Sequence, residues 1–300
     1  MTPLSLTLPK RSAFMGQRYG VAETFPKAFS TAMFRAGVRT RAFELCAAEA
    51  YDAKKIPVPI YLCLGQEFNS AALSCVADDM QIFAQHRAHG IYLAYGGEPE
   101  ALRDELLGLP SGCAKGMAGS NAIHCPAINM YGHSGLMGEQ VSIAVGAALA
   151  SNKPTLTIFG DASAEEDYIY PALGLAASRK LPVLFICEDN GLSILTPVST
   201  RRTWSVTTLA ASLGIPSVDI ADDPWLIASE VQTKVLCGLP ALITIHTCRD
   251  VWHAGTGKDG APEWDRFSMV LQQMRDLDLE QEATQALCDA YAWAKGLWTY

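Results

Sequence analysis

Short apolar segments alternate with helical ones throughout the second half of the chain, and this alternation constrains the fold more than any other feature of the sequence. The predicted strands, read from short apolar runs, are 155–159, 182–187, 217–220 and 241–247. Helical spacing of apolar side chains marks 138–150, 168–179, 206–213 and 224–235. Strands that alternate with helices of this length predict a parallel sheet covered on both faces. The predicted class is therefore α/β, with a parallel sheet flanked by helices.

The first half of the chain has a different character. Residues 29–55 and 68–77 show helical periodicity. Between 83 and 135 glycine is frequent, which indicates backbone that lies close to a ligand rather than packed regular structure. Because we find no internal repeat and no long linker, we expect a single domain. The expected organisation is an N-terminal arm (1–28), a ligand-binding domain (29–263) and a C-terminal helical tail (264–300).

The composition argues against nucleic acid and a membrane as partners. The chain has 23 Lys and Arg against 31 Asp and Glu, a formal net charge of −8. An acidic chain without a basic run disfavours nucleic acid, although a few local positive groups can still bind small anions. The longest smooth apolar run, 141–150, is too short for a membrane span and is typical of a buried helix.

The cysteines and the N-terminus bear on the compartment. Nine cysteines without a CxxC pair indicate reduced core thiols, so we expect an intracellular, cytoplasmic protein. The first residues are basic and free of acids, a faint likeness to a transit peptide. We favour the alternative, a loose N-terminal arm.

Two oxygen-bearing side chains follow two of the predicted strands. Asp161 comes directly after the strand 155–159, and Asn190 follows the strand 182–187. The carboxyl ends of parallel strands line one edge of a sheet, where ligands bind. A carboxylate and an amide oxygen suit Mg²⁺, which keeps further positions for phosphate oxygens. The alternative is that Asp161 caps the next helix and Asn190 occupies a turn.

These residues lie in motifs that resemble a known family. Gly160-Asp161-Ala162 and Asp189-Asn190 are similar to the thiamine diphosphate signature Gly-Asp-Gly … Asn-Asn. The segment 180–190, KLPVLFICEDN, resembles α subunits of 2-oxo acid dehydrogenases of the pyruvate, branched-chain and acetoin type. LGQE (64–67), HRAHG (86–90), GCAKGMAGSNAIH (112–124) and GHSGLMGEQVSIAVGAALA (132–150) occur in the family's order and spacing. The resemblance covers roughly 30–255 and implies the thiamine diphosphate-binding fold.

The resemblance also implies roles for individual residues. The metal ligands would be Asp161, Asn190 and the carbonyl of Leu192. The catalytic candidates are His253 and His89. The cofactor-binding set is His86, Arg87, Gly135, Met137, Gly160, Asp161, Ala162, Asn190, Leu192 and His253. In this set Arg87 pairs with the diphosphate, for which a guanidinium fork is well suited, while Gly135 and Met137 hold the aminopyrimidine ring through backbone groups.

The chain departs from the family's pattern at several positions. His86 stands where the family usually has Tyr, and Ala162 replaces a Gly. In the Arg-x-x-Gly-His-Ser loop, Trp252 replaces the Gly and Ala254 the Ser, so a serine that is phosphorylated in some members is absent. Glu166 either favours the dipole of the following helix or sits like the glutamate that links paired sites in transketolase.

The resemblance predicts half of an enzyme. In the family, the glutamate that activates the cofactor belongs to a second, pyrimidine-binding domain of ordinary domain size. We therefore expect the α subunit of a decarboxylating 2-oxo acid dehydrogenase with thiamine diphosphate and Mg²⁺, a separate β subunit (α2β2), and transfer of the acyl or hydroxyalkyl unit to a lipoyl or other carrier. The alternatives are the N-terminal half of a split transketolase and a non-catalytic scaffold subunit.

Overall fold

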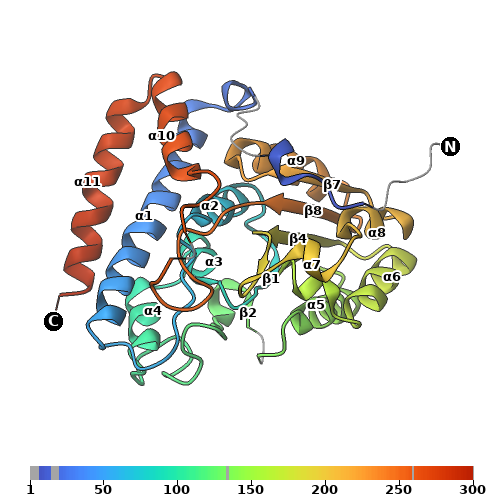
Figure 1. The fold of residues 1–300 in the computed structure, drawn as a ribbon, viewed down its shortest axis with the longest axis horizontal. Coiled ribbons are helices and arrows are strands. Elements are labelled where there is room, and N and C mark those ends of the chain that lie inside the picture. The colour runs from blue at the N-terminus through green and yellow to red at the C-terminus, as the bar shows by residue number, and fades with distance from the viewer. Residues whose placement is uncertain (1–6, 15–19, 133–134, 259, 300) are drawn as a thin grey trace.

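A parallel sheet of six strands in the order β2-β1-β3-β4-β8-β7 forms the centre of the molecule (Figure 1). It is seen in a computed structural model that describes residues 7–14, 20–132, 135–258 and 260–299. The strands are β1 (Gln81–Phe83), β2 (Met130–Tyr131), β3 (Thr155–Gly160), β4 (Val183–Asp189), β7 (Ser217–Ala221) and β8 (Ala241–His246). A separate antiparallel pair, β5 (Leu192–Ser193) and β6 (Thr196–Pro197), follows β4. The predicted α/β class with a parallel sheet is confirmed.

Helices cover both faces of this sheet, as the alternation predicts. The longer helices are α1 (Lys27–Asp52), α2 (Glu67–Val76), α5 (Glu139–Ser151), α6 (Ile169–Arg179), α9 (Pro224–Val235), α10 (Arg266–Asp276) and α11 (Glu280–Leu297). The shorter ones are α3 (His89–Ala94), α4 (Pro99–Leu106), α7 (Val198–Arg201), α8 (Val206–Ser212) and the 3-10 turns η1 (Arg11–Ala13), η2 (Ala22–Thr24), η3 (Pro126–Ile128) and η4 (Ser163–Glu165). None of the helices in the described ranges is long and apolar enough to cross a membrane.

Two apolar clusters lie on opposite faces of the sheet. Side chains of α1, α2, α3 and α9 pack on one face, against Ile158, Ile186 and Ile243 among others. Side chains of α5, α6 and α8 pack on the other, against Phe159 and Phe185. Successive residues of β3 and β4 thus enter different clusters, because side chains of a strand alternate between faces. Burial on both faces explains why these two strands are continuous apolar runs.

The C-terminal helices extend the first of these layers. In Figure 1, α11 lies beside α1 along most of its length. The Arg39 guanidinium stacks on the Trp293 ring at 4.0 Å, and Lys295 forms an ion pair with Glu49. Within the layer, α1 and α2 approach closely at Gly37, where a Cβ atom would meet the Phe68 ring.

The glycine-rich segment 83–135 contains more regular structure than the sequence suggests. It includes α3 and α4, both of which lie in the stretch predicted to be mainly loop. The loop after α4 folds around the buried carboxylate of Glu105. Its two oxygens accept four backbone N–H groups, from Ala114 and Gly116 at 2.7 and 2.9 Å and from Ala118 and Gly119 at 2.7 and 3.0 Å. Several glycines are therefore needed to wrap backbone around a side chain of the protein itself.

Candidate functional site

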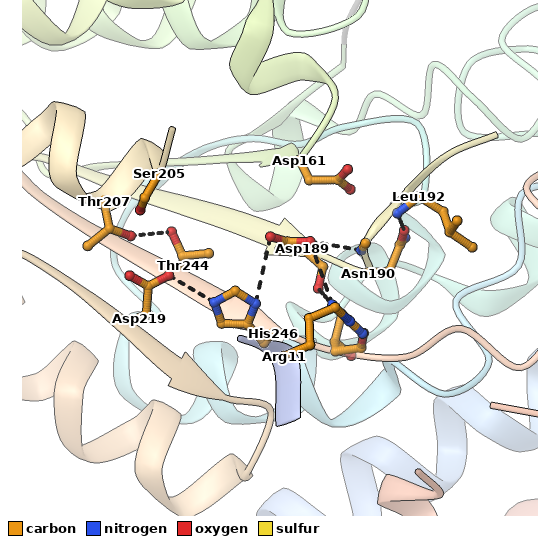
Figure 2. A network of polar contacts seen from close by, with 12 residues as sticks. Arg11, Asp161, Asp189, Asn190, Leu192, Ser205, Thr207, Asp219, Thr244 and His246 are labelled. Atoms are coloured by element: carbon orange, nitrogen blue, oxygen red, sulfur yellow. Dashed lines mark hydrogen bonds and ion pairs between the residues drawn. The ribbon is translucent and has the colours of Figure 1, made fainter. Parts of the chain in front are cut away.

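The two predicted metal ligands lie at the ends of adjacent strands. In the register of β3 and β4, Gly160 pairs with Glu188, so Asp161 and Asn190 leave the sheet side by side (Figure 2). The sequence predicted this adjacency from strand–helix alternation alone, and the pairing of β3 with β4 confirms it. The site lies at the carboxyl edge of the sheet, where α/β folds bind ligands.

Asp161 is buried and already faces positive charge. Its carboxylate forms an ion pair with Arg201, and its backbone carbonyl accepts a hydrogen bond from Arg202 at 2.6 Å. Both arginines also contact Glu165 of η4. Burial raises the pKa of the Asp161 carboxyl, and the neighbouring charge of Asp189 adds to this, while the two arginines act in the opposite direction. A cation bound there would act in the same direction as the two arginines and favour the charged form of the carboxylate.

A tight turn presents Asn190 and Leu192. The Asp189 carboxylate accepts the N–H of Gly191 at 2.8 Å, and Asn190 Oδ1 accepts the N–H of Leu192 at 3.1 Å. Gly191 has φ +79°, which a glycine adopts without strain. The turn alternative for Asn190 thus holds, but it does not exclude metal binding, because an amide oxygen has a second lone pair.

A cluster of three rings lies at the end of β1. His86 and His253 have ring centroids 5.1 Å apart, and Tyr61 packs edge-on against both at 5.1 and 5.4 Å. The structure thus brings together two residues that the resemblance assigned to the cofactor, from segments far apart in the chain. Tyr61, which is not among the predicted site residues, completes the cluster.

Arg87 is buried beside this cluster. Its guanidinium donates to the carbonyl of Leu62 and, at 3.2 Å, to that of His253. Burial and the nearby positive charge of Arg249 lower the pKa of Arg87 to about 10. Because the Arg87 and Arg249 guanidinium groups repel each other, this part of the site favours an anionic ligand. Arg249, also buried, donates to the carbonyl of Ile194 at 2.6 Å. Sequence reasoning gave Arg249 no role, although it begins the motif that contains His253.

The residues on either side of Asp161 lie at the end of β3 and around η4. Gly160 ends β3, with Gln85 so close that a Cβ would lie 3.2 Å from its side-chain oxygen. Gln85 in turn donates to buried Glu188 at 2.6 Å, which ties the end of β1 to β4. Ala162 is half-buried directly before η4, and Glu166 is exposed directly after it. An exposed Glu166 leaves both of its proposed roles open.

The loop before α5 contains Gly135 and Met137. Gly135 is exposed with φ +112°, and the Met137 carbonyl accepts the hydroxyl of Tyr168. Two residues of this motif, His133 and Ser134, lie outside the described residues. The backbone roles predicted for Gly135 and Met137 stay predictions.

His89 occupies a different environment from the other candidates. It has no exposed surface, and its ring nitrogens contact Glu44 at 2.6 Å and Ser120 at 2.8 Å. Because both nitrogens are engaged in the protein interior, this geometry does not support the catalytic role predicted for His89. It indicates a histidine that fixes α3 against α1 and the glycine-rich loop.

A cavity of about 590 Å³ opens beside the turn. Asn190 and Leu192 line it together with Arg249 and His246, and residues 8, 9 and 11 of the N-terminal segment close one side. The sequence predicted a loose arm, whereas the described residues 7–14 lie against the candidate site.

Comparisons with known proteins identify the family of this chain and relatives that resemble it in sequence or in fold. The family model described as "Dehydrogenase E1 component" matches residues 35–232. The chain belongs to the dehydrogenase E1 component family. Pyruvate dehydrogenase E1 component subunit alpha, somatic form, mitochondrial, is 37% identical over 164 residues in both Rattus norvegicus and Homo sapiens, covering 53% of this chain and 42% of each relative. Transketolase from Leishmania mexicana shares the fold, with a TM-score of 0.53 and 14% identity over 94% of this chain and 46% of the transketolase.

The chain thus spans less than half the length of these pyruvate dehydrogenase relatives. Family membership accounts for the resemblance read from the motifs, and the E1 family uses thiamine diphosphate.

The donor set at the strand ends fits a hard cation that is shared with a diphosphate. Among the described residues no group of three or more His, Cys, Asp or Glu side chains could hold a metal. A cation at Asp161 and Asn190 would therefore need further oxygens from a ligand, as Mg²⁺ with a diphosphate has. The Asp161 carboxylate pairs with the Arg201 guanidinium, so a bound cation would share this carboxylate with Arg201 or displace it.

Proposed function

We propose that this E1-family chain is the α subunit of a thiamine diphosphate-dependent, decarboxylating 2-oxo acid dehydrogenase. The observation that carries the proposal is the pair of oxygen donors, Asp161 and Asn190, on adjacent strand ends, with the buried Arg202 at Asp161 and the buried Arg249 in the cavity beside Asn190. The oxygen donors suit Mg²⁺, and the guanidinium groups suit a diphosphate. The site therefore matches magnesium and diphosphate together better than it matches magnesium alone or diphosphate alone.

Each part of the site has a distinct task in this proposal. Asp161, Asn190 and the Leu192 carbonyl would hold Mg²⁺. Arg87 and Arg249 would pair with the diphosphate, because their mutual repulsion in a buried place is relieved by negative charge. When bound, thiamine diphosphate supplies the thiazolium carbon that adds to the 2-oxo acid and stores the electron pair left by decarboxylation.

In the proposed enzyme, the ring cluster would act on the substrate end of the site. His86 and His253 each carry nitrogens able to donate to a phosphate or to a developing alkoxide. Tyr61 packs on both rings and restrains their orientation. The backbone of Gly135 and Met137 would hold the aminopyrimidine ring. These residues bind, orient and donate, while the cofactor supplies the reactive carbon.

A second chain completes the proposed enzyme. The described residues build one parallel sheet with its helices, which in this proposal is the diphosphate-binding unit. A β subunit with a pyrimidine-binding domain would supply the activating glutamate, in an α2β2 assembly. The acyl or hydroxyalkyl unit would then pass to a lipoyl or other carrier.

Magnesium-dependent binding of thiamine diphosphate tests the proposal. Asp161→Asn keeps the size of the side chain but removes the charge that binds the cation. We expect affinity to fall at least about tenfold, as for loss of a charged ligand worth roughly 1.4 kcal/mol or more. Binding is measured by titration calorimetry on the full chain with its β subunit. Asp167→Asn, at an exposed acid of the same segment, is the control. Full affinity in the D161N variant would refute the metal assignment.

A further inference from the structure

The N-terminal segment 7–14 lies across the carboxyl edge of the sheet, next to the turn that carries Asn190. Thr7 pairs with Trp204 in an antiparallel bridge, and the N–H of Leu8 donates to the Thr203 carbonyl at 3.1 Å. These contacts hold the start of the segment near α8, so that η1 reaches the candidate site. Figure 2 shows Arg11 beside Asp189 and Asn190.

Arg11 binds both the backbone and the charge of the turn. Its guanidinium donates to the carbonyls of Asp189 at 3.0 Å and Thr247 at 2.8 Å. Its Nη1 lies 3.7 Å from Oδ1 of Asp189, the oxygen that also accepts the Gly191 N–H. On its other side Arg11 pairs with Glu263 at 2.9 Å and stacks on the Trp264 ring at 5.1 Å. The guanidinium is thus fixed at one oxygen of Asp189.

The second oxygen of Asp189 faces His246. His246 Nδ1 lies 3.7 Å from Asp189 Oδ2, and Nε2 lies 2.8 Å from Oδ1 of Asp219 (Figure 2). The His246 ring stacks on Phe14, with centroids 4.1 Å apart and planes 8° from parallel. The N-terminal segment therefore contacts Asp189 directly through Arg11 and indirectly through Phe14.

Asp189 adds a negative charge where an anion would bind. It stands at the first Asn of the signature Asn-Asn, next to the metal ligand Asn190, and its carboxylate is 8% exposed. A buried carboxylate repels a diphosphate bound beside it, and this repulsion is strong in a medium of low dielectric constant. A positive group fixed close to the carboxylate attracts it and offsets the repulsion.

We propose that Arg11 is a positioning residue that neutralises Asp189 and thereby fixes the metal-binding turn, so that the N-terminal segment is part of the cofactor site of this chain. Arg11 acts through Asp189 and the two carbonyls, since none of its hydrogen bonds or ion pairs within the described residues goes to Asp161 or to the Asn190 side chain. This inference rests on the proposed function, because it concerns the same magnesium diphosphate.

A double-mutant cycle on the full chain with its β subunit tests the proposal, with thiamine diphosphate and Mg²⁺ as the probe. Arg11→Gln is expected to weaken binding about tenfold, as for loss of one partly buried charge interaction. Asp189→Asn keeps an oxygen for the Gly191 N–H and removes the need for a counter-charge. In the D189N background, R11Q is therefore expected to change affinity by less than about twofold.

Two further variants separate charge from folding. Arg11→Lys keeps the positive charge and is expected to recover most of the affinity lost in R11Q. Arg275→Gln removes an exposed arginine that pairs with Glu280, far along the chain, and is expected to change nothing. Thermal unfolding of each variant shows whether a lost affinity reflects a lost fold.

The outcomes are distinct from those for the proposed function. If the wild-type chain shows no magnesium-dependent binding, the proposed function fails. If the wild type binds and R11Q has the same effect in both backgrounds, or no effect, the positioning role of Arg11 is overturned. Tighter binding in R11Q overturns it as well, because the segment would then compete with the cofactor.

Discussion

Replacing Glu105 with glutamine tests how the glycine-rich loop is held in place. The carboxylate is fully buried and accepts four backbone N–H groups, two on each oxygen. In E105Q one oxygen becomes an NH₂ group, which faces two N–H donors and accepts neither. Each lost hydrogen bond to a charged acceptor costs about 1.5–3 kcal/mol. Because two such bonds are lost, the expected loss in free energy of unfolding is about 3–6 kcal/mol.

Two measurements check this value. For a chain of this size, each kcal/mol lowers the melting temperature by roughly 2–4 °C, so E105Q is expected to melt about 10 °C below wild type. Amide hydrogen exchange is expected to accelerate at Ala114, Gly116, Ala118 and Gly119 more than elsewhere. The control is Glu100→Gln, at an exposed position of the same helix. An E105Q protein as stable as the control would refute the account of the loop.

Three further predictions concern helices on the two faces of the sheet. Burial raises the pKa of Glu67 to about 7 in spite of its ion pair with Arg41, so the folded chain binds this proton more tightly than the unfolded one. The free energy of unfolding is thus expected to fall as pH rises from about 4.5 to about 7, a slope that Glu67→Gln removes in urea titrations at a series of pH values. Gly37→Ala is expected to lower stability, because overpacking against Phe68 costs about 1–3 kcal/mol and outweighs the helix propensity gained. Gly146→Ala, where a new Cβ meets open space, is expected to raise stability by up to about 1 kcal/mol, and equal effects of the two substitutions on melting temperature would contradict the packing argument.

The hydrophobic pattern of the sequence predicted the buried strands and several of the helices. Strands β3 and β4 are buried on both faces and therefore appear in the sequence as unbroken apolar runs. Helix α9 begins and ends as its periodicity predicts. Because parallel strands that follow one another through a helix tend to be neighbours, the order of the elements along the chain was enough to place Asp161 next to Asn190.

Contacts between distant segments could not be read from the sequence. The pairing of Arg201 with Asp161, and the approach of Tyr61 to His86 and His253, depend on packing that no periodicity encodes. The N-terminal segment has no regular pattern of its own and is placed by a few specific contacts. The frequent glycines of 83–135 predicted backbone close to a ligand, whereas part of this backbone surrounds the Glu105 side chain. Glycine allows a close approach of the backbone but does not specify what it approaches.

The strand order has a consequence for how the chain assembles. β8 is the last strand of the sheet to be synthesised, yet it lies between β4 and β7. Until residues 241–246 are in place, β7 has no neighbour in the sheet, and β4 presents an unpaired apolar edge of the kind that promotes association between chains. β8 also carries His246, which lies 3.7 Å from Asp189, so the strand that covers this edge of β4 is the same one that brings His246 to the turn proposed to bind the metal.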